Sequence, residues 1–244
     1  MILAGDHVQV LVDGYDLTSD HNKIVVNDVR KMLATPVFGE AVEKYIPGQR
    51  QPKLEHNGYL NPTTGRSHPV LNGALVDGVV SVLLGQNTAP AVGDPMYNLM
   101  TQQEQYASNP MVGSDEGSVV PFAAMFSNRR GARAGWGVAL AVPVDISDST
   151  NGATVDNGAE STNGGAAFLH ILTAPASDTY SIEVEGSSNG STWGNIATFT
   201  LDGSAIGSDV LALNGTLPRY LRYKATRSGS AGDILRLAVA VVRY

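Results

Sequence analysis

The chain has 244 residues, of which 43% are hydrophobic and 16% charged, and its formal net charge is −7. The apolar fraction suffices for packed cores and excludes a disordered chain, whereas the acidic balance argues against wrapping nucleic acid, which needs a basic surface. The absence of cysteine excludes disulfides and zinc sites built on thiolates.

No apolar run approaches the roughly eighteen residues needed to span a bilayer. Residues 1–4 are too short for the apolar part of a signal sequence and lack a basic segment before them. We therefore expect a protein that is made in a cytoplasm and has no membrane partner.

The N-terminal region alternates short apolar runs with turns. Strands are predicted at residues 8–12 and 24–26. The Asp-Gly pair directly after residue 12 predicts the turn of a hairpin. Residues 46–69 are rich in Pro, Gly and Asn with interleaved basic residues, and predict a long excursion with one strand around residues 53–60. Such an excursion usually acts outside the core of its own domain, and a merely tolerated surface loop is the alternative.

The middle of the chain contains the only helix signal. Residues 72–84 are apolar at most positions and predict a strand that is buried on both faces. Asp94 and Pro95 resemble an N-cap and a first helical residue, and apolar residues follow at helical spacing until Pro110. We expect a helix near residues 95–107 whose apolar stripe faces the core.

Two further strands are predicted at residues 119–126 and 135–144, around a turn that contains three Arg. In an acidic chain, a solvated turn or a contact with an acidic neighbour is favoured over phosphate binding there. Residues 145–165 are polar and rich in Gly, Asn, Ser and Thr, and we interpret residues 147–165 as an interdomain linker. The spacing of its acidic residues does not fit a calcium loop.

The C-terminal region, residues 166–244, contains five apolar or alternating runs separated by turns, which is typical of a compact β-sandwich. Glu183 and Glu185 alternate with apolar residues in one run, as Arg222 and Lys224 do in another. Cross-strand ion pairs between these two runs are expected, each worth a few tenths to about 1 kcal/mol.

The predicted fold class is therefore all-β with one short α-helix. The expected domains are residues 1–146, a β-sandwich or barrel-forming domain that includes the helix near 95–107, and residues 166–244, a second β-sandwich. Residues 147–165 would link them.

Sequence patterns of catalysis are missing. The five histidines lie apart and form no His-x-His or His-Glu-x-x-His pattern. The chain also lacks the Gly-x-Ser-x-Gly nucleophile motif, a phosphate-binding loop and a dinucleotide-binding Gly motif. We expect no catalytic residue, no metal and no cofactor, and thus a protein that is not an enzyme. The histidines are His7, His21, His56, His68 and His170.

Several short motifs occur in an order that resembles the major tail (tail tube) proteins of long-tailed bacteriophages. They are Val-Asp-Gly-Tyr-Asp-Leu at residues 12–17, Pro-Val-Phe-Gly at 36–39 and Tyr-Ile-Pro-Gly at 45–48. Ser-Ser-Asn-Gly-Ser-Thr-Trp at 187–193 and Arg-Tyr-Leu-Arg at 219–222 resemble the β-sandwich domain often appended to such proteins.

The resemblance implies a virion structural protein in the viral tail. The N-terminal domain would be tail-tube-like, its sheets would join in hexameric rings, and the rings would stack into a tube for DNA ejection. The implied partners are further copies of the chain, other tail proteins, and viral DNA that passes through without specific binding. The excursion at 46–69 would reach a neighbouring subunit, so the expected ring contacts are Tyr45, Ile46, Pro47, Arg50, Lys53 and Arg66.

Two alternatives remain open at this point. One is a different virion component, such as a capsid or neck decoration protein or a baseplate piece. The other is a glycan-binding adhesion module, in which Trp193 and Tyr220 would contact sugar on the C-terminal sandwich, although a buried Trp beside a turn is the commoner arrangement.

Overall fold

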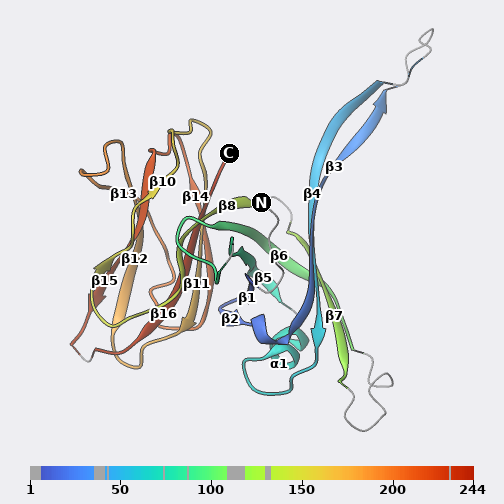
Figure 1. Cartoon of the computed structure of the whole chain (residues 1–244), viewed down its shortest axis with the longest axis horizontal. Helices are drawn as coiled ribbons and strands as arrows, with labels where there is room; N and C mark the ends of the chain where they lie inside the picture. Colours follow the sequence, from blue (N-terminus) through green and yellow to red (C-terminus); the bar gives the residue numbers. More distant parts are fainter. Residues whose placement is uncertain are drawn as a thin grey trace.

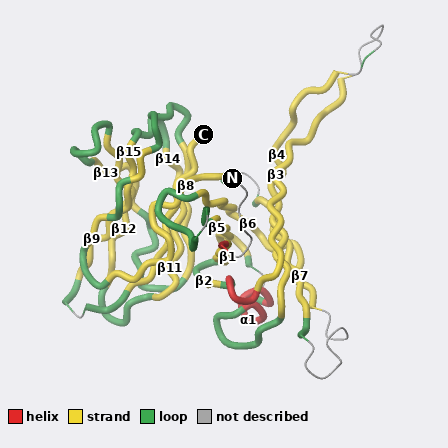
Figure 2. The backbone as a smooth tube through the Cα atoms, viewed as in Figure 1, coloured by secondary structure: helices red, strands yellow, loops and turns green. Residues whose placement is uncertain are grey.

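The computed structural model describes residues 7–35, 42, 44–73, 75–86, 88–108, 119–129, 133–230 and 232–244. These residues form antiparallel strands with one short α-helix, so the predicted all-β class is confirmed. Figure 2 shows that strands and loops make up nearly all of the described chain.

The strands belong to two sheets. The larger sheet consists of β1 (Val8–Val12), β2 (Tyr15–Asp16), β3 (His21–Thr35), β4 (Lys44–Tyr59), β5 (Val76–Leu84), β6 (Pro95–Ser108), β7 (Pro121–Asn128), β8 (Ala134–Ile146), β11 (Gly165–Thr173), β14 (Gly207–Leu213) and β16 (Leu235–Arg243). The smaller sheet consists of β9 (Thr150–Asn151), β10 (Val155–Asp156), β12 (Thr179–Ser187), β13 (Gly194–Thr198) and β15 (Tyr220–Ser228). The helical elements are a short 3-10 turn (Thr18–Asp20) and α1 (Ser67–Asn72).

The larger sheet divides at β6. One edge of β6 pairs with β5, while residues 95–99 of the other edge pair with β8 and residues 101–108 pair with β7. One branch continues through β8 to β16, β11 and β14, and the other continues through β7 to β4 and β3. The result is four layers, which Figure 1 shows from left to right: the smaller sheet, then β16, β11 and β14, then β1, β5 and β6, then β7, β4 and β3.

The predicted helix near residues 95–107 is wrong, because this segment is strand β6. Met96, Tyr97 and Leu99 are fully buried in a central strand that has neighbours on both edges. Met96 packs on one face of the strand, and Tyr97 and Leu99 pack on the other. A strand covered on both faces is apolar at most positions, so some of its residues also fit the spacing of a helix. Asp94 is not a helix cap, since its carboxylate accepts a hydrogen bond from the Ala91 amide in the preceding turn at 2.8 Å.

The one short α-helix among the described residues is instead α1, which begins near the end of the segment predicted as an excursion at 46–69. The strand expected around residues 53–60 is present but longer, since β4 begins at Lys44. The other strand predictions agree with β1, β3, β5, β7, β8, β11, β12, β13, β15 and β16, whereas β14 was not predicted. The predicted hairpin turn after residue 12 is also present, because β1 pairs with β2 across Asp13 and Gly14.

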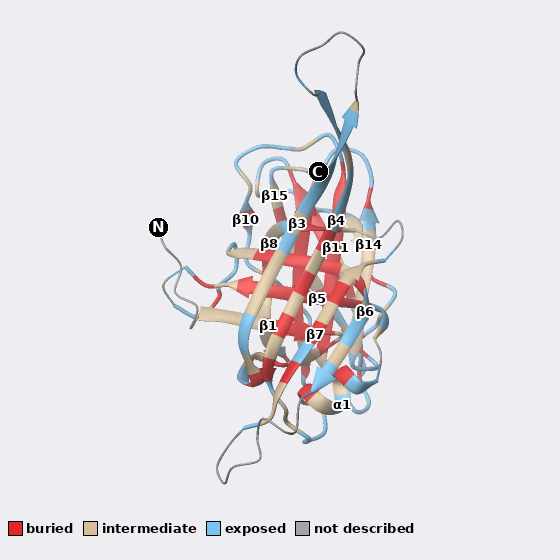
Figure 3. Cartoon of the chain, turned by 90° about the vertical axis from the view of Figure 1, so that its right-hand side faces the viewer, coloured by how far each residue is buried: buried red, intermediate tan, exposed pale blue. Residues whose placement is uncertain are grey.

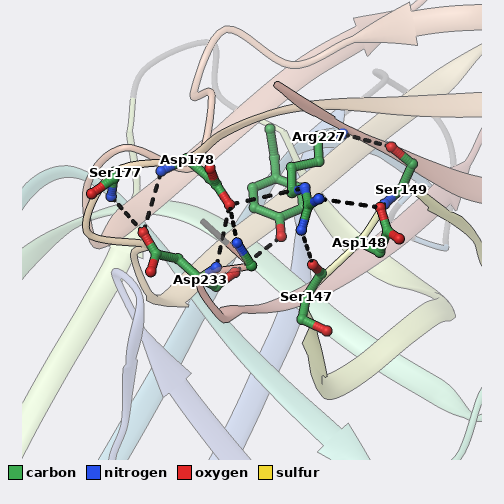
Figure 4. A network of polar contacts seen from close by, with 9 residues as sticks. Ser147, Asp148, Ser149, Ser177, Asp178, Arg227 and Asp233 are labelled. Atoms are coloured by element: carbon green, nitrogen blue, oxygen red, sulfur yellow. Dashed lines mark hydrogen bonds and ion pairs between the residues drawn. The ribbon is translucent and has the colours of Figure 1, made fainter. Parts of the chain in front are cut away.

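The predicted linker is hydrogen-bonded to the C-terminal sandwich. Within residues 147–165, β9 and β10 both pair with β15. Figure 4 shows how the start of this segment is tied down by Arg227, which donates from its guanidinium to the Ser147 carbonyl and from its backbone amide to Ser149 Oγ. The Asp178 carboxylate, which lies 3.9 Å from the Arg227 guanidinium, accepts hydrogen bonds from the backbone amides of Gly232 and Asp233.

Sheet pairing continues across the expected domain boundary, because β8 pairs with β6 on one side and with β16 on the other. One hydrophobic cluster fills the C-terminal sandwich, and another lies between β1, β5 and β6 and the layer of β4 and β7. Two smaller buried clusters contain residues of both regions. The division into two domains at 146 and 166 stays a prediction.

A buried polar network joins the two middle layers. His170 Nδ1 accepts a hydrogen bond from the Gly14 amide at 3.3 Å, so the ring proton resides on Nε2, which lies 2.8 Å from Ser81 Oγ. The Ser81 hydroxyl donates in turn to Asn98 Oδ1 at 2.8 Å. Gly14 is needed at this contact, because its φ is +82° and a Cβ there would lie 2.5 Å from the Ile171 carbonyl oxygen.

Two buried histidines should make the folded state less stable at acidic pH. Burial lowers the pKa of His56 and of His170 to about 3, from about 6.5 in the unfolded chain. The unfolded chain therefore binds more protons between these values, and stability falls as the pH drops from about 6.5 towards 3. At pH 4.5 we expect each histidine to reduce the free energy of unfolding by roughly 2–3 kcal/mol relative to pH 7.5, measured by urea denaturation.

His56→Leu provides the control. Neither ring nitrogen of His56 has a hydrogen-bond partner among the described residues, so this substitution breaks no hydrogen bond at pH 7.5. In this variant, the free energy of unfolding should fall between pH 7.5 and 4.5 only by the contribution of His170. Equal stability of the wild-type protein at pH 4.5 and 7.5 would contradict the prediction.

Candidate assembly surface

Part of the β3–β4 hairpin extends beyond the body of the molecule. Residues 53–59 of β4 lie between β3 and β7, whereas residues 44–52 pair only with residues 28–35 of β3. We call residues 28–35 and 44–52 the arm. Figure 1 and Figure 3 show it as a two-stranded ribbon that projects away from the layers, and most of its residues are exposed.

The arm has little support from its own subunit. At about 3.3 Å per residue, residues 28–35 span roughly 25 Å. The arm is therefore longer than the ~10 Å that separates two packed sheets. An isolated two-stranded ribbon is only marginally stable in water. An arm of this kind gains its stability by packing against another surface.

Large apolar side chains are exposed on both faces of the arm. Leu33 pairs with Ile46 across the ribbon, and paired residues share a face. Tyr45 pairs with Ala34, one position along, and so lies on the opposite face. Five of the fourteen exposed large hydrophobic residues in the described part of the chain belong to the arm: Val29 (53%), Met32 (53%), Leu33 (43%), Tyr45 (53%) and Ile46 (51%).

Charged residues gather where the arm leaves the body, around an open groove of about 960 Å³. The Arg50 guanidinium forms an ion pair with Asp28, and Arg30 lies directly opposite Arg50 on the neighbouring strand. Lys53 contacts Glu104 at 3.0 Å, and this hydrogen bond holds the pKa of the Glu104 carboxyl below its usual value. Because at least one side chain of each pair is accessible to solvent, each pair stabilises the fold by no more than about 1 kcal/mol.

The six residues expected as ring contacts therefore fall into three places. Tyr45, Ile46 and Pro47 are exposed on the arm, and Arg50 and Lys53 line the groove at its base. Arg66 lies apart from them beside α1, where its guanidinium donates to Ser19 Oγ at 3.0 Å. Their role in subunit contacts stays a prediction.

Sequence reasoning missed the β3 side of the arm. Met32 and Leu33 are exposed and pair with Pro47 and Ile46, but neither was among the expected ring contacts. The mixture of apolar and basic residues at 29–33 is the signal that could have revealed a strand with two exposed faces. The tail-protein-like motif at 36–39 lies outside the described residues, whereas the motif at 45–48 lies on the arm.

The basic turn between β7 and β8 meets an acidic neighbour within the chain. Arg129 forms an ion pair with Asp77, the second residue of β5. Arg133 lines a small cavity beside Arg50 and Tyr244, and Arg130 lies outside the described residues.

The residues expected to contact glycan lie at the smaller sheet: Tyr220 begins β15, and Trp193 directly precedes β13. The Arg222 guanidinium lies 4.2 Å from the centroid of the Trp193 ring, and the Arg219 guanidinium lies 4.9 Å from that of the Tyr220 ring. One face of each ring is therefore engaged by a cation of the same chain. Glycan binding at Trp193 and Tyr220 stays a prediction.

The cross-strand ion pairs predicted on this sheet are present. Glu185 contacts Arg222 at 2.7 Å, and Glu183 contacts Lys224 at 3.2 Å, and each pair lies directly opposite across β12 and β15.

The described residues offer little for catalysis or metal binding. No group of three His, Asp or Glu side chains within the described ranges could hold a metal ion. Ser81 and His170 resemble a nucleophile and its base, but both are fully buried and the Ser81 hydroxyl donates to Asn98 rather than to His170. Among the helices that the structure describes, none is long and apolar enough to cross a membrane.

The exposed apolar residues of the arm should contribute little to the stability of a single subunit. We expect Leu33→Thr combined with Ile46→Thr to change the free energy of unfolding by no more than about 0.5 kcal/mol, because both side chains are solvated and Thr suits a strand. Leu54→Ala, on the buried part of the same strand, should cost about 2–5 kcal/mol. Chemical denaturation of the monomer compares the two, and an equal loss in both would contradict this assignment.

Comparison with known proteins gives distant similarities only. No family model matches the chain, and no curated protein matches it. Among solved structures, a chain from the virion of a native gene transfer agent particle is 8% identical and covers 55% of this chain and 98% of its own length, with a TM-score of 0.41. A chain from the cap that terminates the anti-feeding prophage tube is 12% identical and covers 53% of this chain and 89% of its own length, with a TM-score of 0.42.

A third solved structure is similar over a longer stretch. It is the SPP1 Dit protein, described as a hub of the adsorption apparatus in phages that infect Gram-positive hosts. It is 11% identical and covers 96% of this chain and 99% of its own length, with a TM-score of 0.34. With all three TM-scores below 0.5, these similarities assign no family to the chain.

Proposed function

We propose that this protein is a virion structural protein, the tail tube subunit of a long-tailed bacteriophage, which assembles with copies of itself into stacked rings that conduct DNA during ejection. The observation that supports this most directly is the arm. It is a two-stranded ribbon with apolar side chains on both faces and no third strand beside it among the described residues.

The exposed side chains of the arm favour a protein partner. Fully burying one large apolar side chain contributes about 1.5–3 kcal/mol, and the arm offers five of them. Exposed apolar surface of this kind, with basic residues along it, is typical of an interaction site. Contact with a neighbour would also support the ribbon itself.

Two arguments favour further copies of the same chain as the partner. The motif at residues 45–48 that resembles tail tube proteins lies on the arm, so the sequence resemblance and the structural feature coincide. Moreover, β3 pairs only with β4 and β14 only with β11 among the described strands, so each presents an edge that ring closure would protect. The net charge of −7 suits a conduit that does not retain DNA.

The rival assignments would use the same arm differently. A baseplate or neck component would form a single ring or bind other proteins, whereas a tube subunit forms ring upon ring. A glycan-binding module would depend on Trp193 and not on the arm. The number and stacking of rings therefore separates these functions.

Electron microscopy and light scattering of the purified full chain test the proposal. We expect the wild-type protein to form stacked rings, and Leu33→Thr with Ile46→Thr to weaken association at least about tenfold, as losing about 1.4 kcal/mol would. The matched control is Ile206→Thr with Ile234→Thr, which alters exposed apolar residues outside the arm and should leave assembly unchanged. Wild-type protein that stays monomeric at every concentration would refute the proposal.

A further inference from the structure

A groove lies beside α1, at the end of the molecule opposite the arm. Its volume is about 390 Å³, and its apolar lining comes from Tyr15, Val70, Leu75 and Val76. Figure 1 and Figure 3, which are related by a quarter turn, both show the arm at one end of the molecule and α1 at the other. An arm cannot therefore reach the groove of its own subunit.

The apolar surface of this groove is unusually exposed. Val76 is 73% exposed, which among the described large hydrophobic residues is exceeded only by Val42 (77%), located between the two strands of the arm. Tyr15, Val70 and Leu75 are half-buried and pack on the core beneath them. The groove thus has a floor supported by the core and an exposed apolar rim, and its volume suits a few side chains rather than a whole element.

The region that contains the arm and the rest of the chain also differ in charge. Residues 21–59, which contain the arm, have six Lys and Arg against four Asp and Glu; from totals of 16 and 23, the rest of the chain has ten against nineteen. Lys31 and Lys44 lie on the arm, whereas Asp13 lines the groove and Asp16 ends the neighbouring strand β2. Asp13 is the one charged residue among the described residues that line the groove, so a groove with an apolar floor and a carboxylate complements a basic arm with apolar faces, although Arg66 lies nearby.

We propose that the arm of one copy docks in the groove beside α1 of a second copy, with the Leu33 and Ile46 side chains against Val76 and its neighbours. This inference rests on the proposed function and names the surface of the partner that receives the arm. Because arm and groove are different surfaces at opposite ends, each copy uses its arm on one neighbour and its groove on another. Such a heterologous contact has a single polarity and no two-fold axis, and it generates a closed ring where the rotation between copies closes and an open head-to-tail stack where it does not.

The absence of cysteine from the sequence permits a clean cross-linking test. A disulfide forms only when two Cβ atoms approach to about 3.5–4.5 Å, so it reports direct contact. Ile46→Cys and Val76→Cys are prepared as separate full-length proteins, mixed and oxidised mildly. We expect a disulfide-linked dimer in the mixture that is missing when either variant is oxidised alone.

Ile234→Cys is the matched partner for Ile46→Cys, because Ile234 is 52% exposed and lies on the C-terminal sandwich. This pair should give no dimer above background. Electron microscopy of the same unoxidised mixtures reports whether the chain assembles at all.

The outcomes separate the two proposals. Stacked rings together with a selective link between positions 46 and 76 support the docking inference. Stacked rings without that link, or with an equal link between positions 46 and 234, overturn the docking inference and leave the proposed function standing. Monomers with no link in any mixture overturn both.

Discussion

Strand β6 shares one of its hydrogen-bonding edges between two strands, and the rest of the architecture depends on this arrangement. Residues 95–99 hold β8 and residues 101–108 hold β7, so one continuous sheet leaves β6 in two directions. Every backbone amide and carbonyl in the buried part of a sheet needs a hydrogen-bond partner. The pairing with β6 therefore fixes the direction in which each branch continues. One branch becomes a layer of the C-terminal sandwich, and the other becomes the base of the arm.

The branch that contains β16 and β11 is held against the layer of β1, β5 and β6 by polar as well as apolar contacts. Small and medium apolar side chains, among them Ala139, Ala238 and Ala240, fill the space between the middle layers. The chain of hydrogen bonds from Gly14 through His170 and Ser81 to Asn98 then permits only one register, because a one-residue shift would leave several buried polar groups unpaired. A rigid body of this kind can hold a projecting ribbon in a defined direction.

The arm and the groove beside α1 are features of a protein that works through its surface. Nothing in the packing of the single subunit requires Leu33, Ile46 or Val76 to be apolar, since all three are solvated. Exposed apolar side chains carry a risk of aggregation, and a basic arm on an acidic chain limits the orientations in which copies meet. Assembly through two unlike surfaces explains both features with one contact.

The sequence by itself determined the elements whose signals are local. The Asp-Gly turn after residue 12, the apolar run that forms β5 and the alternation of Glu183 and Glu185 opposite Arg222 and Lys224 specify strands and register through neighbouring residues, so these predictions agree with the structure. Its all-β class follows from many such turns. The role of the exposed, proline-containing segment at 45–48 outside the core stays a prediction.

Only the tertiary structure decided the identity of β6, the fork and the arm. A strand buried on both faces has no alternation, so residues 96–100 fit a helical and a strand pattern equally well, and partners distant in sequence settle the choice. Pairing of β8 with β16 joins segments about a hundred residues apart, which no local signal encodes. Likewise, the residue type of Ile46 or Val76 does not tell whether the side chain is buried or exposed. Its exposure depends on how all the other strands pack.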